Sequence, residues 1–320
     1  MPTETSGMRC RTIALERRSA RELSYRQFLN GYVMQNRPVI ITDLARDWRA
    51  LETWTPEFFK SRFGSRLVDV TYGVKARLGE TIDAILQSTV ERPGPYLHKV
   101  IIHQHMPELL SDLAPQHIYG YPLRYSSPLM PGLWRRPDGY LKLLIGGVGG
   151  KFPLLHFDTD NANALITEIY GEKEFVLFCP GDTRYLSVSP SSRHTSPIND
   201  LDSPDPKKFP DFWKATQYRG VIAPGEAMFV PSGWWHSARV VTTSISVCVN
   251  MLHASNWTGF VDEACDPEVV RSRLRRAMKR VYLGFAGLAM SFAEGLQAKY
   301  PGAAARTFAS LSPLPPQGAA

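Results

Sequence analysis

The sequence feature that most constrains this chain is a histidine and an aspartate two residues apart in an apolar stretch. The stretch reads Leu-Leu-His-Phe-Asp-Thr-Asp and contains His156 and Asp158. Alternate residues of a strand face the same side, so both side chains can point into the interior of a barrel. Asp160 has the same parity, but it lies beyond the motif and is expected to be a turn residue.

A second motif downstream supplies the third member of the same group. A Pro-Gly-Glu turn and an apolar strand at 227–230 lead to Pro-Ser-Gly-Trp-Trp-His, which ends at His236. A lone His-x-Asp is a weak signal, but its combination with this motif is specific. Two imidazoles and one carboxylate hold a metal ion on one face and leave positions open, as in non-haem Fe(II) sites. We therefore predict that His156, Asp158 and His236 are metal ligands.

Residues 139–256 have the pattern of a β-barrel or sandwich, because short apolar or alternating runs are separated by Gly, Pro and Asp turns. The expected strands are 140–145, 163–169, 174–178, 220–223, 227–230 and 244–250. An insert at 186–218 is rich in Ser, Pro and Asp and is expected to be irregular and functional.

The flanking regions differ from this strand-rich middle. Residues 1–20 are expected to be an arm that ends in an edge strand, and 21–138 to be a mixed α/β part that packs on the barrel. Residues 257–300 are expected to be helical, and 301–320 to be a flexible tail. The predicted fold class is therefore mainly β with flanking helices.

Composition excludes several classes of protein. The 320 residues include 43% hydrophobic and 21% charged residues, which is ordinary for a globular chain. The four cysteines form no Cys-x-x-Cys pair, so we expect neither a zinc knuckle nor a disulfide framework. The polar N-terminus has no signal-peptide pattern, and the longest apolar stretch, 282–293, is too short for a membrane span. We expect a cytoplasmic protein whose net charge of +7 reflects either a solvated surface or an acidic protein or nucleic-acid partner.

Together these motifs resemble the JmjC or cupin-like (cupin-8) family of Fe(II)/2-oxoglutarate-dependent hydroxylases. The resemblance covers about residues 25–256. It rests on His-Phe-Asp-Thr at 156–159, Pro-Ser-Gly-Trp-Trp-His at 231–236, Gly-Glu-Lys at 171–173, the insert at 203–212 and Arg-Pro-Val-Ile-Ile at 37–41. It implies a double-stranded β-helix, a jelly-roll or cupin-like core. It also implies Fe(II) as cofactor and 2-oxoglutarate and O2 as cosubstrates.

The resemblance assigns the cosubstrate contacts residue by residue. Lys173 matches the lysine that pairs with the distal carboxylate of 2-oxoglutarate, and a buried carboxylate does need a charged partner. Tyr96 matches a tyrosine that hydrogen-bonds the same carboxylate, and Asn250 an asparagine that lines the site. Members of the family often have Thr or Ser at the position where this chain has Pro153. Thr167 has the same strand parity as Lys173 and is the expected substitute.

The implied activity is hydroxylation of a C–H bond, with an amino-acid side chain of a protein or peptide as the expected substrate. N-methyl demethylation and hydroxylation of a small metabolite, a natural product or a modified tRNA base remain alternatives. A cupin enzyme without 2-oxoglutarate and a metal-binding module are alternatives of another class. The C-terminal helix is expected either to form a homodimer or to pack on the chain's own barrel. The loop at 120–138, with Trp134, Arg135 and Arg136, and the insert are expected to flank the substrate entrance.

Overall fold

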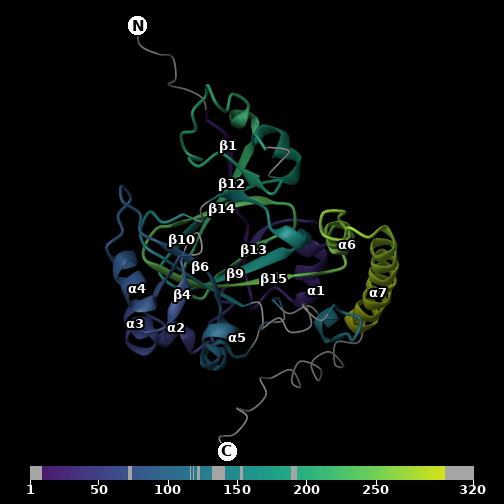
Figure 1. Ribbon diagram of the computed structural model, residues 1–320, viewed down its shortest axis with the longest axis horizontal. Helices are drawn as coiled ribbons and strands as arrows, with labels where there is room; N and C mark the ends of the chain where they lie inside the picture. Colours follow the sequence, from purple (N-terminus) through teal and green to yellow (C-terminus); the bar gives the residue numbers. More distant parts are fainter. Residues whose placement is uncertain are drawn as a thin grey trace, which may run out of the picture.

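Two facing β-sheets form the centre of the computed structural model, which describes residues 9–70, 74–115, 117, 119–120, 123–131, 141–151, 154–188 and 193–299 (Figure 1). The six-stranded sheet has the order β1 (Arg11–Ala14), β12 (Thr216–Ile222), β10 (Lys173–Phe178), β14 (Trp235–Val240), β8 (Leu155–His156) and β11 (Thr195–Ser196). The seven-stranded sheet has the order β2 (Arg17–Ser19), β3 (Val39–Thr42), β13 (Ala227–Val230), β9 (Asn163–Tyr170), β15 (Ser244–Met251), β7 (Lys142–Gly146) and β6 (Tyr96–Ile101). A small separate sheet pairs β4 (Leu67–Asp69) with β5 (Lys75–Arg77).

The chain passes back and forth between the two large sheets. β7, β9, β13 and β15 belong to the seven-stranded sheet, whereas β8, β10, β12 and β14 belong to the six-stranded sheet. A tight turn at Gly171, whose φ is +76°, joins β9 to β10 and carries the chain across. Glycine adopts this left-handed conformation without steric cost. This alternation is that of a jelly-roll core, and it confirms the predicted fold class.

Both faces of the seven-stranded sheet are covered, which explains why almost all residues of its strands β9, β13 and β15 are buried. On β9, Ala164 and Ile166 pack in the cluster between the two sheets. Leu165 and Ile169 point the opposite way and pack in a second cluster with the N-terminal helices. Successive residues of a strand face opposite sides, so the sequence parity on each strand separates the barrel interior from the outer face.

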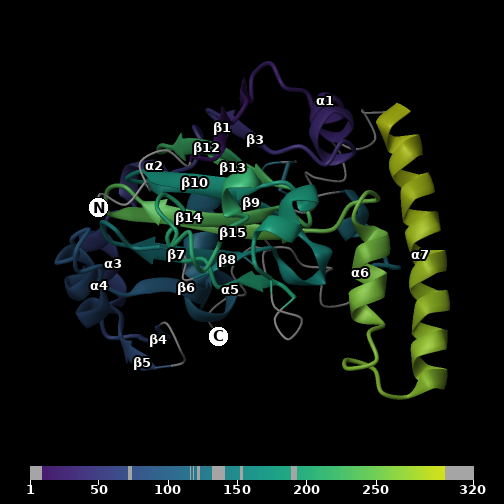
Figure 2. The ribbon, with the colours of Figure 1, turned by 90° about the horizontal axis from the view of Figure 1, so that it is seen from above.

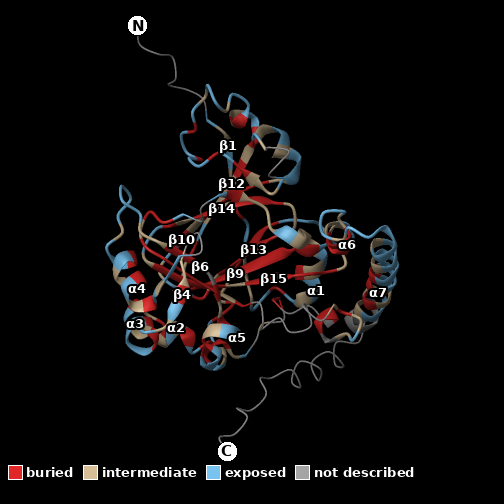
Figure 3. Ribbon diagram, viewed as in Figure 1, coloured by how far each residue is buried: buried red, intermediate tan, exposed pale blue. Residues whose placement is uncertain are grey.

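The N-terminal helical part covers the outer face of the seven-stranded sheet (Figure 3). Its helices are α1 (Tyr25–Phe28), the π-helix η1 (Leu29–Val33), α2 (Ala50–Thr53), α3 (Pro56–Phe63), α4 (Leu78–Leu86), α5 (Ile102–His105) and the 3-10 helix η3 (Pro107–Leu113). Ser24 and Gln27 form a capping box at the start of α1, and Thr55 caps α3 ahead of Pro56. These local signals explain why the helices begin at these residues.

The insert packs on the outer face of the six-stranded sheet. Phe212, Leu186 and Ile198 form one buried cluster with Phe178 and Trp235 of that sheet. Its regular elements are the two-residue strand β11, the 3-10 helix η9 (Phe212–Lys214) and the first residues of β12, and the 3-10 helix η8 (Pro180–Tyr185) precedes it. The insert is thus mostly irregular, as expected, but it has its own apolar core.

Two helices complete the fold beside one end of the sheets (Figure 2). They are α6 (Trp257–Ala264) and α7 (Arg273–Lys299). The Trp257 Nε1–H donates to the Leu283 carbonyl at 2.9 Å and joins α7 to α6. The last helix is expected to begin at Asp266, but Asp266 accepts hydrogen bonds in a turn and the helix begins at Arg273. Among the described residues, no helix is long and apolar enough to cross a membrane.

Candidate metal centre

Two neighbouring strands place the histidines of the predicted triad side by side. His156 of β8 pairs directly with His236 of β14 in the six-stranded sheet. Gly233, with φ +74°, makes the turn that starts β14. Asp158 follows β8 with extended backbone angles, just before the 3-10 turn η7 (Thr159–Asn161). Asp160, with φ 58°, lies inside this turn, as the sequence predicts.

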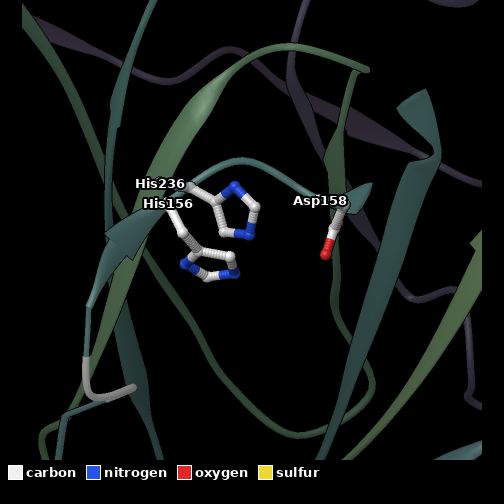
Figure 4. A group of neighbouring side chains, drawn as sticks. All are labelled: His156, Asp158 and His236. Atoms are coloured by element: carbon white, nitrogen blue, oxygen red, sulfur yellow. The ribbon is translucent and has the colours of Figure 1, made fainter. Parts of the chain in front are cut away.

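The structure brings the three side chains together at the barrel interior (Figure 4). One ligand atom from each of His156, Asp158 and His236 lies within 4.8 Å of the others. The two imidazole rings have centroids 4.2 Å apart and planes inclined by 51°. In the part of the chain that the structure describes, this is the one such group of potential metal ligands.

Backbone contacts orient both imidazoles. The Nδ1 atom of His156 lies 3.0 Å from the Leu154 carbonyl, and that of His236 lies 3.0 Å from the Trp234 carbonyl. A carbonyl can only accept, so each Nδ1 carries the proton and each Nε2 keeps its lone pair. Burial, reinforced by the neighbouring His236, lowers the pKa of His156 to about 4. Neutral imidazoles and an ionised carboxylate are the donors that a divalent transition metal requires, so the residues fit such an ion.

A second polar group lies inside the barrel around Lys173, the first residue of β10. The side chain is 1% exposed, and its Nζ atom donates a short hydrogen bond to Ser246 Oγ. The same Nζ lies 3.5 Å from Glu168 Oε2 and 5.8 Å from the centroid of the Tyr96 ring. Lys173 and Tyr96 are therefore together, as the resemblance implies, and Glu168 joins them.

Glu168 is a site residue that the sequence reasoning missed. It is completely buried on β9, where Ser244 Oγ donates to Oε1. Burial raises the pKa of Glu168 to about 7, although the Lys173 charge acts in the opposite direction. Burial also acts to lower the pKa of Lys173, but the neighbouring Glu168 and Tyr96 together raise it. A carboxylate within an otherwise apolar strand is a signal that could have identified this pair.

Asn250, which the resemblance assigns to the lining of the site, lies on β15 and faces the barrel interior. Its Oδ1 atom accepts a hydrogen bond from Lys142 Nζ at 2.9 Å. Lys142, on β7, is a second lysine that the sequence reasoning missed.

The structure does not bring Thr167 to the site. Thr167 lies with Leu165 and Val247 beside a small cavity that Trp48 and His117 also line, on the outer face of the seven-stranded sheet. The sequence prediction carried strand parity from Lys173 back to Thr167 across the Gly171 turn. The chain changes sheets at that turn, and the residues of β9 that face inward are the even-numbered ones.

The residues expected at a substrate entrance are only partly described. Trp234 and Trp235 are buried, and their indole N–H groups donate to Asn36 O and Thr183 Oγ1, each at 2.8 Å. They therefore serve the core. The loop residues expected at the entrance, Trp134, Arg135 and Arg136, lie outside the described ranges.

The fold and the site together define a cupin-type barrel with a candidate metal centre. A family model described as a cupin-like domain matches residues 78–258, which contain all three triad residues. The chain therefore belongs to the cupin-like (JmjC) family, and this confirms the resemblance of its motifs.

Several curated proteins are similar over most of this chain. Arginine-specific demethylase JMJ20 of Arabidopsis thaliana is 27% identical over 271 residues, which are 76% of this chain and 58% of that protein. Lysine-specific demethylase 8 of Xenopus tropicalis is 24% identical over 234 residues, 70% of this chain and 50% of that protein. tRNA wybutosine-synthesizing protein 5 of Danio rerio is 28% identical over 212 residues, 64% of this chain and 51% of that protein. The chain thus spans about half the length of these relatives.

Proposed function

We propose that this protein is an Fe(II)- and 2-oxoglutarate-dependent dioxygenase that hydroxylates a C–H bond. The observation that carries the proposal is the convergence of His156, Asp158 and His236 at the interior of a cupin-like barrel. When bound, Fe(II) and 2-oxoglutarate supply the chemistry: the 2-oxo acid is decarboxylated to succinate and CO2 while one oxygen atom of O2 enters the substrate.

The chain's own residues hold and orient the reactants. The carbonyls of Leu154 and Trp234 orient the two imidazoles so that Nε2 is the ligand atom of each. Three protein ligands leave open positions for the 2-oxo acid and O2. Lys173, with Tyr96 beside it, receives the distal carboxylate in the barrel interior. A cupin reaction without 2-oxoglutarate needs no buried cation there, so Lys173 favours the dioxygenase over that alternative and over a metal-binding module.

The substrate that we propose is an amino-acid side chain in a protein or peptide. Two of the similar proteins are named as demethylases of arginine and lysine, which supports a protein substrate. N-methyl demethylation begins with the same hydroxylation and is the second candidate. The similarity to a tRNA wybutosine-synthesizing protein keeps a modified tRNA base as a further candidate.

The decisive experiment measures succinate formed from 2-oxoglutarate by purified protein with Fe(II) and ascorbate. We expect succinate from the wild type and from His103→Ala, an exposed-histidine control, and none from His156→Ala. A peptide substrate gains the mass of one oxygen if it is hydroxylated, whereas demethylation removes a methylene and releases formaldehyde. A wild-type protein that forms no succinate, even with cell extract as substrate, contradicts the dioxygenase.

We also propose a homodimer formed through α7. The inner face of α7 packs on α6 through Leu283, Ala286 and Met290. Its opposite face exposes an apolar stripe at alternating spacings of four and three residues: Leu274, Met278, Val281, Phe285, Leu288 and Phe292. This is the spacing of a helix–helix seam. The basic residues of α7 gather in its N-terminal half, so an antiparallel pair keeps like charges apart.

The dimer can be tested by light scattering after size-exclusion chromatography. Phe285→Glu lies near the middle of the stripe and is expected to yield a monomer. Val90→Glu, a control at an equally exposed apolar residue far from α7, should leave the mass unchanged. A monomeric wild type at micromolar concentration contradicts this proposal.

All four cysteines are free, which supports the proposed cytoplasmic location.

A further inference from the structure

The inner face of β15 contacts two different lysines. Ser246 accepts a hydrogen bond from Lys173, and four residues further Asn250 accepts one from Lys142 at 2.9 Å. Cys248 lies between them on the same face and packs against the cluster inside the barrel. Four residues of strand span about 13 Å. The barrel interior thus presents one ammonium group near each end of this stretch.

Strand parity shows that Lys142 belongs to the interior. Its neighbours on β7, Leu143 and Ile145, pack in the outer cluster, whereas Leu144 packs between the sheets. Lys142 has the same strand parity as Leu144, and it pairs with Cys248 of the neighbouring strand β15. The hydrogen bond to Asn250 fixes its ammonium group on the same side.

The two lysines differ in how their charge is compensated. Lys173 lies 3.5 Å from the Glu168 carboxylate. For Lys142, no carboxylate of the described ranges lies within ion-pair distance, and its hydrogen-bond partner is a neutral amide. A half-buried cation without a counter-ion is costly. Lys142 is therefore the barrel cation that can accept an incoming anion without displacing a protein carboxylate.

Strand register places Lys142 toward the metal end of the barrel. On β10, Leu177 lies four residues after Lys173 and pairs with His236. On β15, Ser246 pairs with Glu168 near the Gly171 turn, and Asn250, four residues further, pairs with Ala164. Lys142, bonded to Asn250, therefore lies toward the same end of the barrel interior as the triad.

The count of charges favours a ligand with two carboxylates. Inside the barrel, at a pH above the raised pKa of Glu168, Lys142 and Lys173 are positive and Glu168 and Asp158 are negative, so these four charges cancel. A divalent metal and a doubly negative 2-oxo acid then cancel each other as well. Without Lys142 the assembled site would have one uncompensated negative charge in a desolvated interior, which is unfavourable.

Building on the proposed function, we infer that Lys142, held by Asn250, binds the carboxylate of the 2-oxo acid that lies at the metal, while Lys173 binds the distal carboxylate. The site then holds a dicarboxylic 2-oxo acid at both ends. Asn250 is a positioning residue in this arrangement, because it acts through Lys142. Each end contributes a charge-assisted hydrogen bond, so loss of either lysine weakens binding by roughly tenfold or more.

Binding can be measured without turnover by calorimetric titration of Mn(II)-loaded protein. Two probes separate the ends: 2-oxoglutarate, and 2-oxopentanoate, which has the same five-carbon 2-oxo chain without the distal carboxylate. Lys142→Gln is expected to weaken both probes by the same factor, and Lys142→Arg, which keeps the charge, to weaken them much less. Lys173→Gln is expected to weaken 2-oxoglutarate alone. Lys214→Gln, at a lysine whose side chain is 63% exposed, is the control.

The outcomes distinguish this inference from the proposed function. A wild type that binds no 2-oxoglutarate overturns both. If the wild type binds 2-oxoglutarate and Lys142→Gln binds each probe as tightly as the wild type does, only the role of Lys142 is overturned. Weakening of 2-oxoglutarate alone would place Lys142 at the distal end and also overturns the inference. The Mn(II) affinity and unfolding midpoint of each variant show that the fold is intact, and Lys142→Met replaces the glutamine variant if that one does not fold.

Discussion

The two ends of the barrel interior are built in contrasting ways. At the metal end, His156, Asp158 and His236 present three potential metal-ligand atoms within 4.8 Å of one another. At the far end, Lys173 is already surrounded by Glu168, Ser246 and Tyr96. One end is a group of metal-ligand atoms, and the other is a closed charge network that has to rearrange when a carboxylate arrives.

This difference teaches that a buried lysine in such a barrel is not automatically a free anion receptor. Its internal partner decides how strongly it can bind an external one. Three predictions sharpen or break the comparison.

The largest effect is expected at the closed end. Lys173→Met leaves the Glu168 carboxylate buried without its cation, which is expected to destabilise the fold by about 3–5 kcal/mol. Adding Glu168→Leu removes the orphaned charge and should restore much of the stability while 2-oxoglutarate binding stays lost. Chemical denaturation measures both, with Lys214→Met as the surface control. If Lys173→Met is as stable as wild type, the closed network is not a structural pair.

The next effect is a pH dependence that Glu168 introduces. Its pKa rises from 4.5 to about 7 on folding, so the folded state binds this proton more tightly than the unfolded state. The contribution of Glu168 to stability is therefore present at low pH and falls as the pH rises from about 4.5 to 7, by on the order of 3 kcal/mol. Glu168→Gln removes this titration. The free energy of unfolding of the wild type minus that of the variant should therefore decline as the pH rises from about 4.5 to 7.

The comparison with Glu168→Gln is needed because other buried groups titrate nearby. Burial lowers the pKa of His117 to about 4 and that of His253 to about 3, so both destabilise the fold as the pH falls below 6.5. These contributions cancel in the difference between the two proteins. The Lys173 charge, the Tyr96 ring and the hydroxyls of Ser244 and Ser246 face Glu168 and are unchanged in the variant. Parallel stability curves would show that Glu168 does not titrate in this range.

The smallest effects separate two hydroxyls that the sequence alone does not distinguish. Ser246→Ala removes a hydrogen bond to the Lys173 ammonium and is expected to weaken 2-oxoglutarate binding to Mn(II)-loaded protein by roughly tenfold. Thr167→Val lies on the outer face and should change that affinity by less than about twofold. A larger loss in Thr167→Val than in Ser246→Ala would reverse the assignment of inner and outer faces.

Much of the fold could be predicted from local patterns. The capping box at Ser24, the Thr55 cap and the apolar runs of β9, β10, β13 and β15 are local signals, and the corresponding elements form where they indicate. β6 is not among the strands that the sequence predicts, and β8 ends at His156 although the predicted strand continues to Asp158. Pairing with distant strands decides both.

The sequence by itself determined the triad, because the spacing of His156 and Asp158 and the turn before His236 are encoded in short contiguous motifs. The sequence also identified Lys173, the lysine that follows the Gly171 turn. Only the tertiary structure decided which polar residues share the interior with them. Strand parity is defined within one strand and is lost at each turn between sheets, so Thr167 was expected inside and Glu168 and Lys142 were missed. Which face of a strand is the interior is fixed by the partner sheet, and that is a property of the assembled barrel.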